Sequence, residues 1–234
     1  MLILAIDTAL RSASAALLED QEIRAEVFID SGKRQGECIL DAVDEVLRHG
    51  RLDLSAIELF CYTAGPGSFT GLRIGAATVK GFAMTTKKPA VGVSTLDVLA
   101  MNLAGTAGAI CSLVDARKNE VYAALYEGRP GKLPVKVMED AIVDAETFLQ
   151  SLSGRLLFVG DGAEKYRERI NFILGEEGMI ADVRFHQARA SAAAVIGLQK
   201  YYNGAIVGPE AVTPRYFRSS YAVRAECRQS VPGS

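Results

Sequence analysis

The sequence predicts an α/β protein made of two duplicated halves, each with a mixed sheet flanked by helices. Two β-hairpins carry this prediction: strands over residues 2–7 and 12–18 open the chain, and strands over residues 110–115 and 120–126 open a second half. A third observation is the glycine-rich run over residues 65–75, which lies between an apolar strand and a long helix. No tandem sequence repeat is visible, so the duplication is expected in the architecture.

The first half is expected to continue with one more strand and then with alternating helices and strands. Residues 23–29 alternate apolar and polar side chains for much of their length, which adds a third strand to an antiparallel meander. A helix follows, because one face repeats apolar residues at Ile39, Leu40, Val43, Val46 and Leu47. The other predicted elements are a strand over residues 57–63, a helix over 70–86, a strand over 89–93 and a helix that starts at Ser94.

The second half is expected to follow its hairpin with a loop over residues 128–134. The later predicted elements are a helix over residues 145–152, a strand over 156–159, a helix over 163–173 and a helix over 191–202. We expect residues 1–103 with 191–219 to form an N-terminal domain to which the last helix returns. Residues 104–190 form a smaller second domain, and residues 220–234 a flexible tail.

Composition excludes several classes of protein. The chain has 234 residues with 28 acidic and 26 basic side chains, so its overall field offers nucleic acid no general attraction. Its four cysteines are widely spaced without a C-x-x-C pair, which indicates neither a zinc knuckle nor a disulfide framework. The N-terminus reaches Asp7 too early for a secretory signal, and no apolar run approaches about 18 residues. We expect a soluble, cytoplasmic protein without a membrane segment.

The glycine run over residues 65–75 has two interpretations. Free amide N–H groups at a helix N-terminus suit a phosphate or a carboxylate. However, Leu72 and Arg73 stand where a Walker loop has Lys followed by Ser or Thr, and the third glycine comes one residue late for a dinucleotide loop. We favour the second interpretation, a tight turn with close packing.

The helix over residues 70–86 carries only two charged residues, Arg73 and Lys80, on one narrow stripe. A helix that is apolar nearly all round is buried. It is therefore either a central core helix or a helix with one row of side chains against a second chain. Both interpretations stay open.

Several short segments together resemble the TsaB family of the actin-like, Hsp70-like ATPase superfamily. They are Ile6-Asp7-Thr8-Ala9, the run over residues 65–75, Gly92-Val93-Ser94-Thr95-Leu96, Asp115-Ala116-Arg117 with Glu120-Val121-Tyr122, and residues 209–218. The match spans nearly the whole chain in the right order, and the glycine run is its most specific part. The resemblance implies two actin-like, ribonuclease H-like domains.

The resemblance also implies a function in tRNA modification. It identifies a noncatalytic scaffold subunit of the bacterial machinery that installs threonylcarbamoyl on the adenosine next to the tRNA anticodon (t6A). The implied partners are the catalytic paralogue TsaD and the ATPase TsaE, with tRNA bound by the assembled complex. The catalytic paralogue binds a metal through an H-x-x-x-H pattern, whereas this chain has only His49 and His186, far apart in sequence. We therefore expect no catalytic residue and no metal site.

The two helices over residues 39–47 and 70–86 are expected to pack against the matching pair of TsaD as a shared helical bundle. The same surface would close a homodimer when TsaD is absent. The predicted interface residues are Ile39, Val43, Val46, Phe69, Leu72, Arg73, Gly75, Ala76 and Val79. Enlarging Gly75 or Ala76 is expected to block the partner helix.

Two alternatives rest on other residues. An autonomous phosphotransferase or ATPase of the same fold would use Asp7, Thr8, Gly160 and Gly162, and Asp7 could join Asp115 and Asp161 in holding Mg. We expect no cofactor of the chain's own, although ATP or ADP with Mg could lie at the partner interface. A tRNA-binding module would use the four arginines at positions 215, 218, 224 and 228.

Overall fold

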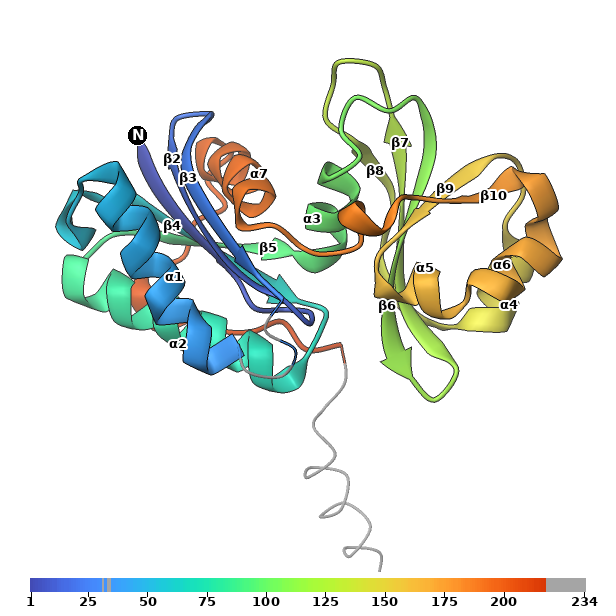
Figure 1. Ribbon diagram of the computed structural model, residues 1–234, viewed down its shortest axis with the longest axis horizontal. Coiled ribbons are helices and arrows are strands. Elements are labelled where there is room, and N and C mark those ends of the chain that lie inside the picture. The colour runs from blue at the N-terminus through green and yellow to red at the C-terminus, as the bar shows by residue number, and fades with distance from the viewer. Residues whose placement is uncertain (31, 33–34, 218–234) are drawn as a thin grey trace, which may run out of the picture.

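The structure is a computed structural model that describes residues 1–30, 32 and 35–217. Its two five-stranded sheets have the same topology (Figure 1). The first sheet has the order β3-β2-β1-β4-β5 and the second has the order β10-β9-β6-β7-β8. In each sheet, the first three strands in sequence form an antiparallel meander. The next two strands are parallel to the first strand of the meander and extend the sheet from its free side. The predicted duplication is confirmed.

The strands of the first sheet match the sequence predictions closely. They are β1 (Leu2–Asp7), β2 (Ala13–Glu19), β3 (Glu22–Ile29), β4 (Leu59–Gly65) and β5 (Ala90–Ser94). The strands of the second sheet are β6 (Gly108–Arg117), β7 (Glu120–Gly128), β8 (Val135–Asp144), β9 (Leu156–Val159) and β10 (Gly178–Ile180). Strands β8 and β10 were not predicted: both lie at an edge, Glu139 and Asp140 interrupt the apolar pattern of β8, and β10 has three residues.

Seven α-helices cover the sheets. They are α1 (Gln35–Gly50), α2 (Phe69–Thr86), α3 (Thr95–Met101), α4 (Ala145–Ser151), α5 (Asp161–Lys165), α6 (Arg167–Leu174) and α7 (Ala190–Tyr202), among the described residues. Short 3₁₀ turns are η1 (Leu54–Ala56), η2 (Gly175–Glu177), η3 (Val183–Phe185) and η4 (Pro209–Ala211). The prediction of one continuous helix over residues 163–173 is wrong, because Tyr166 separates two helices, α5 and α6.

Each sheet and the helices that pack on it form one lobe, and the two lobes share part of their apolar core. In the first lobe, α1 and α2 lie side by side on one face of the first sheet and α7 covers the other face (Figure 1). Helices α4, α5 and α6 pack on the second sheet to form the second lobe. Helix α3 lies between the lobes, where Leu96 and Leu99 share one apolar cluster with Ile110 and Val114 of the second sheet.

The last described segment returns to the first lobe. Tyr62 donates a hydrogen bond from its hydroxyl to the carbonyl of Thr213, and the amide of Arg215 donates to the carbonyl of Ala64. The exact domain boundaries stay a prediction, and the proposed tail over residues 220–234 lies outside the described residues. Among the described helices, none has the length and apolar character needed to cross a membrane.

Candidate functional site

Asp7 ends β1 as a carboxyl group that is completely buried. Its Oδ1 accepts hydrogen bonds from the Thr63 hydroxyl at 2.6 Å and the Ala9 amide at 3.2 Å, while its Oδ2 has no partner among the described residues. Burial raises the pKa of Asp7 to about 7, against the opposing effect of the two hydrogen bonds. Asp7 therefore lies in the core of the first lobe, and its pKa is close to neutral pH.

The glycine run packs its backbone directly on the residues that follow Asp7. A Cβ on Gly67 would lie 2.2 Å from the Ala9 carbonyl oxygen, and a Cβ on Gly71 would lie 2.0 Å from the Thr8 carbonyl oxygen. The Thr8 hydroxyl donates to the Gly71 carbonyl at 2.7 Å. These contacts confirm close packing as the reason for the glycines, because no larger residue fits there.

Two amide groups around the start of α2 have hydrogen-bond partners within the chain. The Ser68 amide donates to the Ala9 carbonyl at 2.7 Å, and the Gly71 amide donates to the Ser68 hydroxyl at 3.3 Å. Ser68 is thus the N-cap of α2. These two amides have partners within the chain, which favours the interpretation of the turn as a packing element.

The second lobe repeats this arrangement at the end of β9. Gly160 has φ +106°, and a Cβ there would lie 2.1 Å from the Leu113 carbonyl oxygen. A Cβ on Gly162 would meet the Leu113 backbone at 2.9 Å. The Gly160 amide donates to Nδ1 of His186 at 3.0 Å. Both glycines therefore pack on the strand that corresponds to β1.

Asp115 and Asp161 lie together in the second lobe. Asp161 accepts a hydrogen bond from the Asp115 amide, and the Asp115 carboxylate pairs with Lys165 at 2.7 Å. Among the described residues, no group of three or more His, Cys, Asp or Glu side chains could hold a metal ion. The carboxylate set of Asp7, Asp115 and Asp161 considered for Mg is therefore not assembled, and the nucleotide candidates Asp7, Thr8, Gly160 and Gly162 serve internal packing.

The two histidines lie in different environments. His49 is exposed in the last turn of α1, where its Nδ1 lies 3.0 Å from the Glu45 carbonyl oxygen. His186 follows η3 and is buried. Its Nδ1 accepts the hydrogen bond from the Gly160 amide in the glycine turn of the second lobe. Burial lowers the pKa of His186, partly offset by Glu164. His186 is therefore an internal hydrogen-bond acceptor.

The predicted interface residues divide into a buried set and an exposed pair. Seven are buried within the chain itself: Ile39, Val43, Val46, Leu72, Gly75, Ala76 and Val79. Most of them form one apolar cluster between α1, α2 and the first sheet, and Gly75 packs on the Thr8 hydroxyl. Only Phe69 and Arg73 are exposed. Substituting Gly75 or Ala76 would therefore disturb the fold of this chain as well as any partner contact.

The exposed side of the two helices is formed by Phe69 and Arg73 together with residues that were not predicted. We call it the outer helical face and define it as Leu40 of α1 with Phe69, Arg73, Ala77, Gly81 and Met84 of α2, all of which are exposed. Arg73 stacks over the Phe69 ring at 3.9 Å and donates to the Tyr216 hydroxyl at 3.0 Å. The sequence carried a signal for this face, because Phe69, Arg73, Ala77 and Gly81 recur every four residues.

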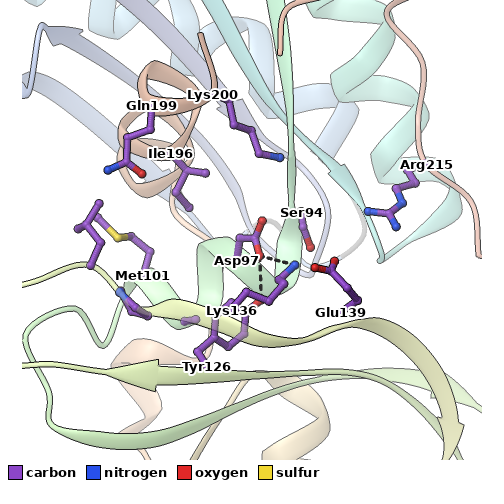
Figure 2. A pocket seen from close by; sticks show the side chains of 13 residues that line it. Ser94, Asp97, Met101, Tyr126, Lys136, Glu139, Ile196, Gln199, Lys200 and Arg215 are labelled. Atoms are coloured by element: carbon purple, nitrogen blue, oxygen red, sulfur yellow. Dashed lines mark hydrogen bonds and ion pairs between the residues drawn. The ribbon is translucent and has the colours of Figure 1, made fainter. Parts of the chain in front are cut away.

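A recess lies between the lobes, beside α3 (Figure 2). Its charged floor joins Lys136 of β8 to Asp97 of α3 and to Asp140 of β8, each at 2.6 Å. Ser94 donates to the buried Asp140 carboxylate at 2.7 Å. Sequence reasoning missed this recess because it depends on β8.

Arg215 is the only arginine of the proposed tRNA set among the described residues. Its guanidinium lies 3.4 Å from Asp140 and stacks over Phe217. Arg218, Arg224 and Arg228 lie outside the described residues.

Comparisons with known proteins give consistent matches. Residues 30–199 match the family model of TsaD, described as tRNA N6-adenosine threonylcarbamoyltransferase. The tRNA threonylcarbamoyladenosine biosynthesis protein TsaB of Bacillus subtilis (strain 168) is 32% identical over 203 residues, covering 86% of this chain and 88% of that protein. TsaB of Escherichia coli (strain K12) is 32% identical over 229 residues, covering 95% and 96%.

A solved structure has the same fold. YeaZ from Pseudomonas aeruginosa superposes with a TM-score of 0.78 at 24% identity, covering 92% of this chain and 99% of that one.

Proposed function

The chain belongs to the TsaB family of tRNA threonylcarbamoyladenosine biosynthesis proteins, and from this we propose that it is a noncatalytic scaffold subunit in t6A synthesis. It pairs with TsaD, the threonylcarbamoyltransferase subunit, and supports its activity. TsaE, an ATPase, joins the pair, and tRNA binds to the assembled complex. The outer helical face forms the contact with TsaD.

The observation that carries this proposal is Gly81, an exposed glycine in the interior of α2. A Cβ at Gly81 would meet nothing within 4 Å, so packing in this chain gives no reason for a glycine. A glycine in a helix interior costs about 0.5–1 kcal/mol relative to alanine. A second helix that approaches α2 closely would explain it, because small residues let helix axes come near each other.

The neighbours of Gly81 support a protein contact. Leu40, Phe69 and Met84 are large apolar residues with about half of their surface exposed, at 53%, 42% and 49%. Arg73 is the only charged residue in the outer helical face, and Ala77 is small. Apolar and aromatic side chains with an arginine and few other charges are typical of the centre of a protein interface.

The glycine turns support the noncatalytic part of the proposal. In the first lobe the Ser68 amide donates to the Ala9 carbonyl, and the backbone of Thr8 and Ala9 packs directly on Gly71 and Gly67. The alternative of an autonomous ATPase is tested by calorimetry with ATP and Mg on the isolated chain. We expect no binding, and tight binding with turnover would favour the enzyme.

The partner contact is tested by co-purification with TsaD. We expect Ala77→Arg and Gly81→Leu each to weaken the complex by at least about tenfold, since Ala77 is exposed and a Cβ on Gly81 would meet nothing within 4 Å in this chain. Ala107→Arg, in an exposed loop of the described chain, is the matched control. Circular dichroism checks that each variant is folded.

Retention of full affinity for TsaD by both variants would contradict the proposal. The same face is proposed to close a homodimer when TsaD is absent. Light scattering on the isolated chain is expected to give a dimer mass that Gly81→Leu reduces to a monomer mass.

A further inference from the structure

The recess between the lobes has the size and position of a small-molecule site. Its volume is about 350 Å³, and pockets for small ligands have volumes of roughly 300–1,000 Å³ and often lie between domains. One wall comes from α3 and α7 and the other from the β7–β8 region. Ala100, Met101 and Ile196 supply apolar surface on the first wall.

The floor of this pocket is fixed by internal ion pairs and does not offer free charge. Lys136 lies between Asp97 and Asp140, and Tyr126 donates its hydroxyl to Asp97 at 2.9 Å. Burial by itself would lower the pKa of Lys136, but the hydrogen bonds to Asp140 and Asp97 outweigh it, so this pKa is raised. Arg215 is held against Asp140. These groups shape the pocket and keep it in place.

Two opposite charges in the pocket walls remain without an ion-pair partner among the described residues. Lys200 of α7 makes only a long contact, 3.4 Å, from its ammonium to the Gly92 carbonyl. The Glu139 side chain of β8 is exposed, and its carboxylate has no hydrogen bond or ion pair with the described residues. Figure 2 shows the Lys200 side chain on one side of the pocket, pointing away from that of Gln199, and Glu139 on the other side. The two charges lie on different lobes and do not pair with each other.

We propose that this pocket binds a small zwitterion of the α-amino acid type. The carboxylate of the ligand pairs with the Lys200 ammonium. The ammonium of the ligand pairs with the Glu139 carboxylate, and an apolar side chain contacts Met101 and Ile196. A bound zwitterion would join the two lobes through charges that are otherwise unpaired.

Charge balance argues against a simple anion. The lining residues Lys136, Lys200 and Arg215 are opposed by Asp97 and Glu139, and Asp140 lies buried beneath them. An anion would gain Lys200 but would face the unpaired Glu139. A ligand with both charges satisfies both walls.

The test uses calorimetry on the isolated chain with L-norleucine, N-acetyl-L-norleucine and L-norleucine methyl ester. We expect L-norleucine to bind, and each blocked form to bind at least about tenfold more weakly because one charged hydrogen bond is lost. Lys200→Met should remove the preference for a free carboxylate, and Glu139→Gln should remove the preference for a free ammonium. Glu168→Gln, exposed on the second lobe, is the matched control.

Equal binding of the N-acetyl form would mean an anion site, and equal binding of the methyl ester a cation site; either result overturns the proposal. Absence of binding by glycine, L-norleucine and L-phenylalanine alike also overturns it. The experiment contains no TsaD, so its outcome is independent of the proposed scaffold function.

Discussion

Asp7 is a carboxyl group in the core of the first lobe, and only one of its two oxygens has a partner in the described structure. In the folded state its pKa is about 7, compared with 3.8 for a free aspartate. A proton is therefore bound more tightly in the folded state than in the unfolded state. The Asp7 carboxyl therefore stabilises the fold at low pH, where it is protonated in both states. It destabilises the fold at high pH, where it is ionised in both states.

Replacement of this carboxyl by an amide should flatten part of the pH dependence of stability. As the pH rises from 4 to 7, Asp7 ionises in the unfolded protein before it ionises in the folded protein. The free energy of unfolding of the wild type therefore falls by up to about 4 kcal/mol relative to that of Asp7→Asn. Urea unfolding at pH 5 and pH 8 measures the difference, with Asp41→Asn on the exposed side of α1 as the control. A constant difference between wild type and Asp7→Asn at both pH values would contradict this account.

Helix α2 contains small residues for two different reasons, on two different sides. Towards the core, Gly71 and Gly75 make room for the backbone and hydroxyl of Thr8. Towards solvent, Ala77 is exposed and a Cβ on Gly81 would meet nothing within 4 Å. The sequence shows that the helix is nearly uncharged, but it does not distinguish the two sides, because small and apolar residues occur on both.

A matched pair of glycine substitutions separates these two roles. Gly71→Ala should lower the free energy of unfolding by at least about 2 kcal/mol, since its Cβ would lie 2.0 Å from the Thr8 carbonyl oxygen. Gly81→Ala should raise it by about 0.5–1 kcal/mol, because the new methyl group meets nothing and alanine favours the helix. Urea unfolding followed by circular dichroism measures both. Similar effects of the two substitutions would show that the core side and the solvent side are not distinct.

Over the whole molecule, the sequence predicted most of the fold. The hairpins, the parallel strands and the long helices have clear periodicity, and their boundaries lie within a few residues of those in the structure. The duplication was predictable because both halves open with a hairpin. Edge strands β8 and β10 were not, since a half-exposed strand broken by acidic residues, or one of three residues, carries little apolar signal.

The candidate sites were less predictable for a physical reason. Rows of apolar and small residues on a nearly uncharged helix predict an interface, but they also mark the side of the helix that packs within its own lobe, where Ile39, Leu72 and Val79 are buried. A partner surface gives a weaker sequence signal than a core-facing side does, because it is formed by exposed residues such as Met84 and Gly81. The pocket between the lobes depends on long-range pairing of β8 with α3, which no local pattern contains.

The most direct test of the scaffold account is the protection of the outer helical face by TsaD. The rate of maleimide labelling of Ala77→Cys would be measured with and without TsaD, with Ala107→Cys in the same experiment as an exposed control. We predict that TsaD slows labelling at position 77 by at least about tenfold and leaves position 107 unchanged. Equal labelling rates at position 77 in a complex that is shown to be formed would contradict the account.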